Sequence, residues 1–175
     1  MKKNAASAIS RRGAILGLAL AVAGCANGFG RGLPGADGGA GAGGLAPGSA
    51  ADPRSPAYFQ EAIGDRVYFA VDQATLSPEA RAILDAQARW LMENPEFTAV
   101  IEGHADERGT REYNLALGAR RAAAVRDYLV SVGVAASRLS TVSYGKERPV
   151  AVCSDESCYS QNRRAVTVLQ PAAMG

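Results

Sequence analysis

Hydrophobic positions follow two different spacings in the later part of this 175-residue chain. Four short apolar segments, at residues 66–71, 97–102, 139–144 and 165–169, have the length and composition of buried strands. Two longer segments between them repeat apolar residues every three or four positions, as amphipathic helices do. This alternation predicts an α/β layer fold in which helices pack on a sheet.

Capping residues predict where the two helices begin and end. The first helix is expected to start after Ser77, since serine caps free amide groups and Pro78 suits the first helical position. It is expected to stop at Asn94, before Pro95. The second helix is predicted to run from about residue 112 to 132 and to end at Gly133.

A helical wheel of the second helix separates two adjacent arginines. The stripe predicted to be buried consists of Leu115, Gly118, Ala119, Ala122, Val125 and Leu129. Arg121 lies on the shoulder of that stripe, beside Asn114, and can reach into a groove. Arg120 faces solvent, and Leu117 is predicted to be an exposed apolar residue.

The N-terminus has the pattern of an export signal. Basic residues precede an apolar run at 13–23 of about eleven residues, which is too short to span a bilayer but typical of a signal peptide. The run ends in Val-Ala-Gly before Cys25. This resembles a bacterial lipobox, in which the cysteine is lipidated, and Ala26 favours sorting to the outer membrane. An ordinary secretory signal is the alternative, and export by the Sec or the twin-arginine route stays open.

Removal of this signal changes the charge of the chain. The formal net charge of +2 includes four basic residues before Cys25, so fifteen Lys and Arg against seventeen Asp and Glu remain, a net of about −2. The positive net charge of the full chain comes from the predicted signal and therefore gives no support for nucleic-acid binding.

Amino-acid composition predicts four segments along the chain. We expect a signal peptide at 1–24, lipidated Cys25 with a flexible Gly-, Ala- and Pro-rich tether at 25–57, one folded domain at 58–170 and a short tail at 171–175. About 110 residues are enough for a single hydrophobic core.

Charged residues gather between the second apolar segment and the second helix. Asp106 and Arg121 together complement a zwitterion, since a carboxylate accepts an ammonium group and a guanidinium binds a carboxylate through two hydrogen bonds. The alternative is a set of surface salt bridges. His104, the only histidine, is expected to be a hydrogen-bonded structural residue, and His104 with Asp106 is too few ligands for zinc. No nucleophile motif is present, so we predict no enzyme activity, no cofactor and no metal.

The same region resembles a known family. The sequence IEGHADERGT at 101–110, Tyr113-Asn114, Arg120-Arg121-Ala122 and NRRAV at 162–166 is similar to the OmpA-like peptidoglycan-binding domain, and within it to the peptidoglycan-associated lipoproteins (Pal). The resemblance covers about residues 66–168. It implies a two-layer βαβαβ(α)β fold with a four-stranded mixed sheet and two main helices.

The resemblance also implies a ligand, the diaminopimelate-containing stem peptide of peptidoglycan. Asp106 would meet its ammonium group and Arg121 its carboxylate, while the other contacts would come from Arg108, Asp72, Leu117, Asn114 and Val71. The family usually has Phe where this chain has Val71, which leaves that wall of the site less filled.

The implied protein is an outer-membrane lipoprotein of the Tol–Pal system, facing the periplasm, with TolB as a partner and a role in cell division. A peptidoglycan-binding lipoprotein outside the Tol system and a wall-modifying enzyme are the alternatives.

Two cysteines depart from typical members of the family. Cys153 and Cys158 have four residues between them, and an exported chain favours their oxidation to a disulfide. Metal binding by this pair is the alternative.

Overall fold

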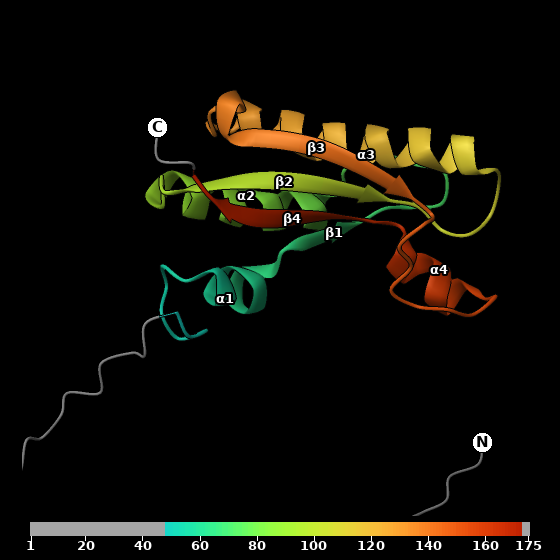
Figure 1. The fold of residues 1–175 in the computed structure, drawn as a ribbon, viewed down its shortest axis with the longest axis horizontal. Helices are drawn as coiled ribbons and strands as arrows, with labels where there is room; N and C mark the ends of the chain where they lie inside the picture. Colours follow the sequence, from blue (N-terminus) through green and yellow to red (C-terminus); the bar gives the residue numbers. More distant parts are fainter. Residues whose placement is uncertain (1–47, 173–175) are drawn as a thin grey trace, which may run out of the picture. The chain divides into compact units, whose positions relative to one another are not determined.

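The computed structural model describes residues 48–172 and contains one mixed sheet with helices (Figure 1). The elements follow the order α1 (Pro56–Tyr58), the π-helical turn η1 (Phe59–Gly64), β1 (Arg66–Tyr68), α2 (Pro78–Glu93), β2 (Phe97–His104), α3 (Arg111–Ser131), the 3-10 turn η2 (Ala136–Arg138), β3 (Leu139–Gly145), α4 (Glu156–Asn162) and β4 (Arg164–Pro171).

The sheet has the strand order β1-β4-β2-β3. β2 and β3 run parallel and are joined through α3, whereas β4 pairs antiparallel with both β1 and β2. The predicted four-stranded mixed sheet with two main helices is therefore confirmed. β1 ends at Tyr68, sooner than the apolar segment at 66–71 does, although the Phe69 amide still donates to the Arg163 carbonyl, the next position in the β1–β4 register.

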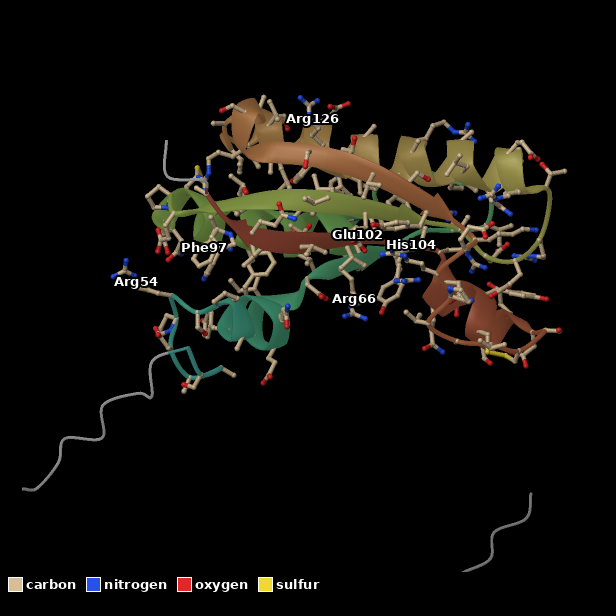
Figure 2. The ribbon with its side chains drawn as sticks, viewed as in Figure 1. Arg54, Arg66, Phe97, Glu102, His104 and Arg126 are labelled. Atoms are coloured by element: carbon tan, nitrogen blue, oxygen red, sulfur yellow. A yellow bond between two sulfur atoms is a disulfide. The ribbon has the colours of Figure 1, made fainter. Side chains whose placement is uncertain are left out.

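The two long helices share one core with the sheet. Leu84 and Leu91 of α2, Val125 of α3 and Ile101 of β2 all belong to a single buried cluster. Ser77 caps α2 as predicted, since its side chain accepts a hydrogen bond from the Ala80 amide. The remaining face of the sheet carries Glu102 and His104, which lie two residues apart on β2 and so point to the same side (Figure 2).

α3 lies unusually close to the sheet at two glycines. A Cβ atom on Gly103 would lie 1.9 Å from the Gly118 carbonyl oxygen, and one on Gly118 would lie 2.4 Å from the Ser143 hydroxyl. Only glycine fits at either position. This contact fixes the rotation of α3 about its axis and presses its first half against the carboxyl ends of β2 and β3.

The wheel prediction for α3 was partly wrong for this reason. Leu115 is 49 % exposed and Leu117 only 5 % exposed, the reverse of the prediction, and Ala119 is exposed as well. The close approach at Gly118 turns the buried face toward that residue, so the buried positions are Asn114, Leu117, Gly118, Arg121, Ala122, Val125 and Leu129. Arg120 is exposed, as predicted.

The packed part of the chain begins before the predicted boundary at residue 58. Ser55 is buried and caps α1, and the Pro53 carbonyl accepts a hydrogen bond of 2.7 Å from the indole of Trp90. The Phe59 ring then packs 5.0 Å from the Trp90 ring. The predicted signal peptide, Cys25, most of the predicted tether and the last three residues of the predicted tail lie outside the described residues. Within residues 48–172, every helix is too short or too polar to cross a bilayer.

Candidate functional site

A cavity of about 250 Å³ opens at the carboxyl end of β2. The loop after β1, the loop after β2 and the first half of α3 enclose it. Its lining contains Val71, Asp72, Asp106, Arg108, Gly109, Tyr113, Asn114, Leu117 and Arg121. The structure thus brings together every ligand-contacting residue expected from the sequence, and it adds Gly109 and Tyr113.

Asp106 is held by two guanidinium groups on one side. Arg108 Nη2 lies 2.6 Å and Arg163 Nη1 lies 3.2 Å from its Oδ2 atom. Burial disfavours the charged carboxylate, but these two hydrogen bonds outweigh burial, so the pKa of Asp106 is lowered from its ordinary value. Asp106 is therefore an anion at neutral pH although its side chain is nearly buried.

Arg121 forms the floor of the cavity. It is fully buried, and its guanidinium donates hydrogen bonds of 2.8, 2.8 and 3.2 Å to the carbonyl oxygens of Gln73, His104 and Ala70. Burial lowers its pKa to about 10, which the nearby Asp106 opposes, so it stays charged at neutral pH. A guanidinium has five N–H groups, so one N–H on each terminal nitrogen takes part in none of these three hydrogen bonds.

Asp72 adopts a backbone conformation that few residues tolerate. Its φ of 56° is the only positive value outside glycine among the described residues. The Tyr113 hydroxyl donates to the Asp72 carboxylate, which raises the pKa of Tyr113 and links the loop after β1 to α3 across the cavity mouth. Val71, beside Asp72, is half exposed at this mouth.

Asn114 and Leu117 complete the wall on the α3 side. The Asn114 amide donates a 2.7 Å hydrogen bond to the Arg108 carbonyl and so holds the loop that carries Arg108. Leu117 gives the cavity an apolar surface next to Arg121.

α4 supports the site from outside the cavity. Glu156, its first residue, pairs with Arg163 and lies 3.8 Å from Arg108, and the Tyr159 ring lies 4.6 Å beneath the Arg108 guanidinium. Reasoning from the sequence had not placed Arg163, Tyr113 or Glu156 in the site. The signal for Arg163 was available, since an arginine pair follows Asn162 at the start of a buried strand.

A disulfide joins Cys153, which precedes α4, to Cys158 in the first turn of that helix. Among residues 48–172, the one group of side chains spaced to hold a metal ion is Cys153, Asp155 and Cys158. Because both sulfur atoms are bonded to each other, they are not free to act as thiolate ligands.

His104 lies behind the cavity as a neutral buried residue. Both ring nitrogens lack a hydrogen-bond partner among the described residues, which differs from the expected hydrogen-bonded histidine. Burial, together with the charges of Arg164 and Arg148, lowers its pKa from 6.5 to about 4. The ring instead stacks on Tyr144, with centroids 5.6 Å apart.

The charges of the cavity balance. Asp72 and Asp106 supply two negative groups, and Arg108 and Arg121 supply two positive ones. Such a site favours a small zwitterion over a simple anion or cation, because each end of the ligand meets an opposite charge.

Comparison with known proteins gives consistent matches. Residues 68–163 match the model of the OmpA family. The chain is 56% identical over 157 residues to the peptidoglycan-associated lipoprotein of Agrobacterium fabrum, which covers 90% of this chain and 86% of that protein. The crystal structure of the peptidoglycan-associated lipoprotein from Burkholderia pseudomallei superposes with a TM-score of 0.61 at 43% identity, covering 69% of this chain and 98% of that chain.

Proposed function

Because this chain belongs to the OmpA family, and within it to the peptidoglycan-associated lipoproteins, we propose that the cavity at the end of β2 binds peptidoglycan. The OmpA domain is a binding domain and not a catalyst. The observation that carries the proposal is the placement of Asp106 and Arg121 in one charge-balanced cavity.

The ligand we propose is the stem peptide that contains diaminopimelate. The free end of this residue carries an ammonium and a carboxylate group on one carbon atom. Asp106 accepts the ammonium group, and the two unused N–H groups of Arg121 bind the carboxylate. Arg108 and Asp72 add polar contacts at the rim.

The apolar part of the same wall suits the rest of the ligand. Leu117 packs against the methylene chain of diaminopimelate, with Val71 at the mouth and Asn114 beside it. Binding through hydrogen bonds and packing is reversible and forms no covalent bond.

At the scale of the cell, the proposal is that lipidated Cys25 anchors the chain in the outer membrane with the domain in the periplasm. Peptidoglycan binding then links that membrane to the wall, within the Tol–Pal system, with TolB as partner and a role in cell division. A lipoprotein that binds peptidoglycan without Tol partners is the second possibility, and co-purification of the chain with TolB separates the two.

Pelleting with purified sacculi tests the binding proposal. We expect the wild-type domain to sediment with intact sacculi and Asp106→Asn to remain in the supernatant, because the amide cannot neutralise an ammonium group. Arg120→Ala is the control, since Arg120 is an exposed charge on α3, the helix that forms one wall of the cavity, and lies outside the cavity lining. Equal sedimentation of Asp106→Asn, or release of soluble fragments from the sacculi, would contradict the proposal.

A further inference from the structure

The two carboxylate oxygens of Asp106 have unequal surroundings. Oδ2 receives both guanidinium groups, from Arg108 at 2.6 Å and Arg163 at 3.2 Å. Oδ1 accepts only the backbone N–H of Arg108, at 3.2 Å. One oxygen of the anion is therefore saturated, and the other keeps a free lone pair for a further donor.

Glu156 accounts for this inequality. Its carboxylate takes Nη2 of Arg163, the nitrogen next to the one that Arg163 offers to Asp106. It also lies 3.8 Å from Arg108 Nη2. The Arg163 guanidinium is thus shared between two carboxylates through different nitrogens, whereas Arg108 faces both carboxylates with the same Nη2 atom; each guanidinium gives Asp106 a single hydrogen bond.

An arginine facing one carboxylate prefers the bidentate arrangement, in which two parallel N–H groups bind both oxygens. Without Glu156, Nη2 of Arg163 loses its acceptor, and Asp106, which Nη1 already binds, is the one carboxylate that this guanidinium still contacts. A bidentate pair with Arg163 or Arg108 would then occupy Oδ1 and leave no acceptor for the ligand.

We propose that Glu156 is a positioning residue that holds Arg163 and Arg108 on one oxygen of Asp106 and keeps the other oxygen open for the ammonium group of the ligand. This inference rests on the proposed function and adds the source of its selectivity for an ammonium group. Glu156 itself lies outside the cavity lining and acts through the two arginines.

The alternative to a positioning role is that Glu156 makes only a surface ion pair, since its side chain is 59% exposed. Surface pairs contribute little to stability. The two accounts predict different binding affinities. If Glu156 makes only a surface pair, its removal does not change the affinity for one functional group of the ligand more than for another.

Three tripeptides with different third residues separate these accounts by calorimetric titration. The first contains diaminopimelate, the second contains 2-aminopimelate, which keeps the terminal carboxylate and lacks the ammonium group, and the third contains lysine, which keeps the amine and lacks the carboxylate. In Glu156→Gln we expect roughly tenfold weaker binding of the diaminopimelate and lysine peptides, the loss of about one charge-assisted hydrogen bond. Binding of the 2-aminopimelate peptide is expected to stay within about twofold of wild type.

Two variants control this measurement. Glu156→Asp keeps the carboxylate and is expected to recover part of the affinity for the ammonium-bearing peptides. Glu96→Gln removes a comparable exposed charge, the partner of Arg54, and is expected to bind all three peptides like wild type. Arg54 and Phe97, the residue after Glu96, lie at the opposite end of the sheet from α4 (Figure 1 and Figure 2). A thermal unfolding curve confirms that each variant is folded.

Unchanged binding of all three peptides by Glu156→Gln, or an equal loss for all three, would overturn the role of Glu156. Failure of the wild-type domain to bind the diaminopimelate peptide is a different result. That result would overturn the proposed function, and with it the role of Glu156 in positioning the arginines.

Discussion

At the scale of single residues, Asp72 shows how the site uses a strained position. Its φ of 56° lies in the left-handed region, which costs most residues about 1–2 kcal/mol but is more accessible to aspartate. The conformation directs the chain from β1 around the cavity mouth, where Tyr113 binds the Asp72 carboxylate. Local strain at a cavity rim is typical of functional positions.

Two substitutions of Asp72 distinguish the effect of its backbone conformation on stability from the effect of its carboxylate on binding. We expect Asp72→Ala to be about 1 kcal/mol less stable than Asp72→Gly, because only alanine has a Cβ atom that opposes the positive φ. Both variants are expected to bind the stem peptide more weakly than wild type. Urea unfolding and peptide titration measure the two effects, and equal stability of the two variants would refute the strain.

At the scale of elements, the amino-acid pattern predicted the strands and long helices well because each carries its own signal. α2 has a serine cap and a proline stop, and β2 opens with the mostly apolar run FTAVI. α4 has no such pattern: its seven residues, ESCYSQN, lack apolar periodicity. It is held by the Asp155 cap, the disulfide and its contacts with arginines. The cysteine spacing predicted the disulfide, whereas the contacts with arginines are tertiary and a single sequence does not reveal them.

The rotation of α3 could not be predicted for a related reason. A helical wheel weighs apolar side chains, whereas the contact that sets the rotation is between two glycines, Gly103 and Gly118. Seven of the nine residues that line the cavity were nevertheless expected together, because the resemblance to the family named them. Glu156 contacts the site only through Arg163 and Arg108, and no pattern in the chain marks such a position.

The disulfide around α4 gives a prediction at this scale. Replacing both cysteines, as Cys153→Ser with Cys158→Ser, removes the closure of a short loop and is expected to cost about 2 kcal/mol on the chain-entropy model. Because α4 carries Glu156 and Tyr159, which contact Arg108, we also expect weaker binding of the stem peptide. Urea unfolding and titration check both effects, and a double variant equal to wild type in each would show that the disulfide is dispensable.

At the scale of the whole molecule, different parts of β2 contribute to the stability of the fold and to the cavity. The middle of the strand lies in the hydrophobic core through Ala99 and Ile101, and its carboxyl end leads through His104 to the cavity. His104 is buried and neutral, so it contributes to the pH dependence of stability and not to the charge of the site.

The pH dependence of unfolding follows from His104. As pH falls below 6.5 the unfolded chain takes up a proton on this residue, whereas the folded chain does so only near its lowered pKa of about 4. Protonation therefore favours the unfolded state, and the free energy of unfolding is expected to fall by up to about 3 kcal/mol between pH 7 and 4.

His104→Gln is the comparison, since the chain has no second histidine. We expect urea unfolding of this variant to lose that part of the pH dependence, whatever its stability at pH 7. Equal slopes for both proteins between pH 6.5 and 4 would contradict the assignment.

The central claim is that one cavity binds both charged groups of a diaminopimelate stem peptide. A crystal structure of the domain with that tripeptide tests it most directly. We predict the ammonium group within hydrogen-bonding distance of Asp106 Oδ1, and the carboxylate against the terminal nitrogens of Arg121. A peptide bound on another surface, or bound here with its ammonium group away from Asp106, would contradict the account.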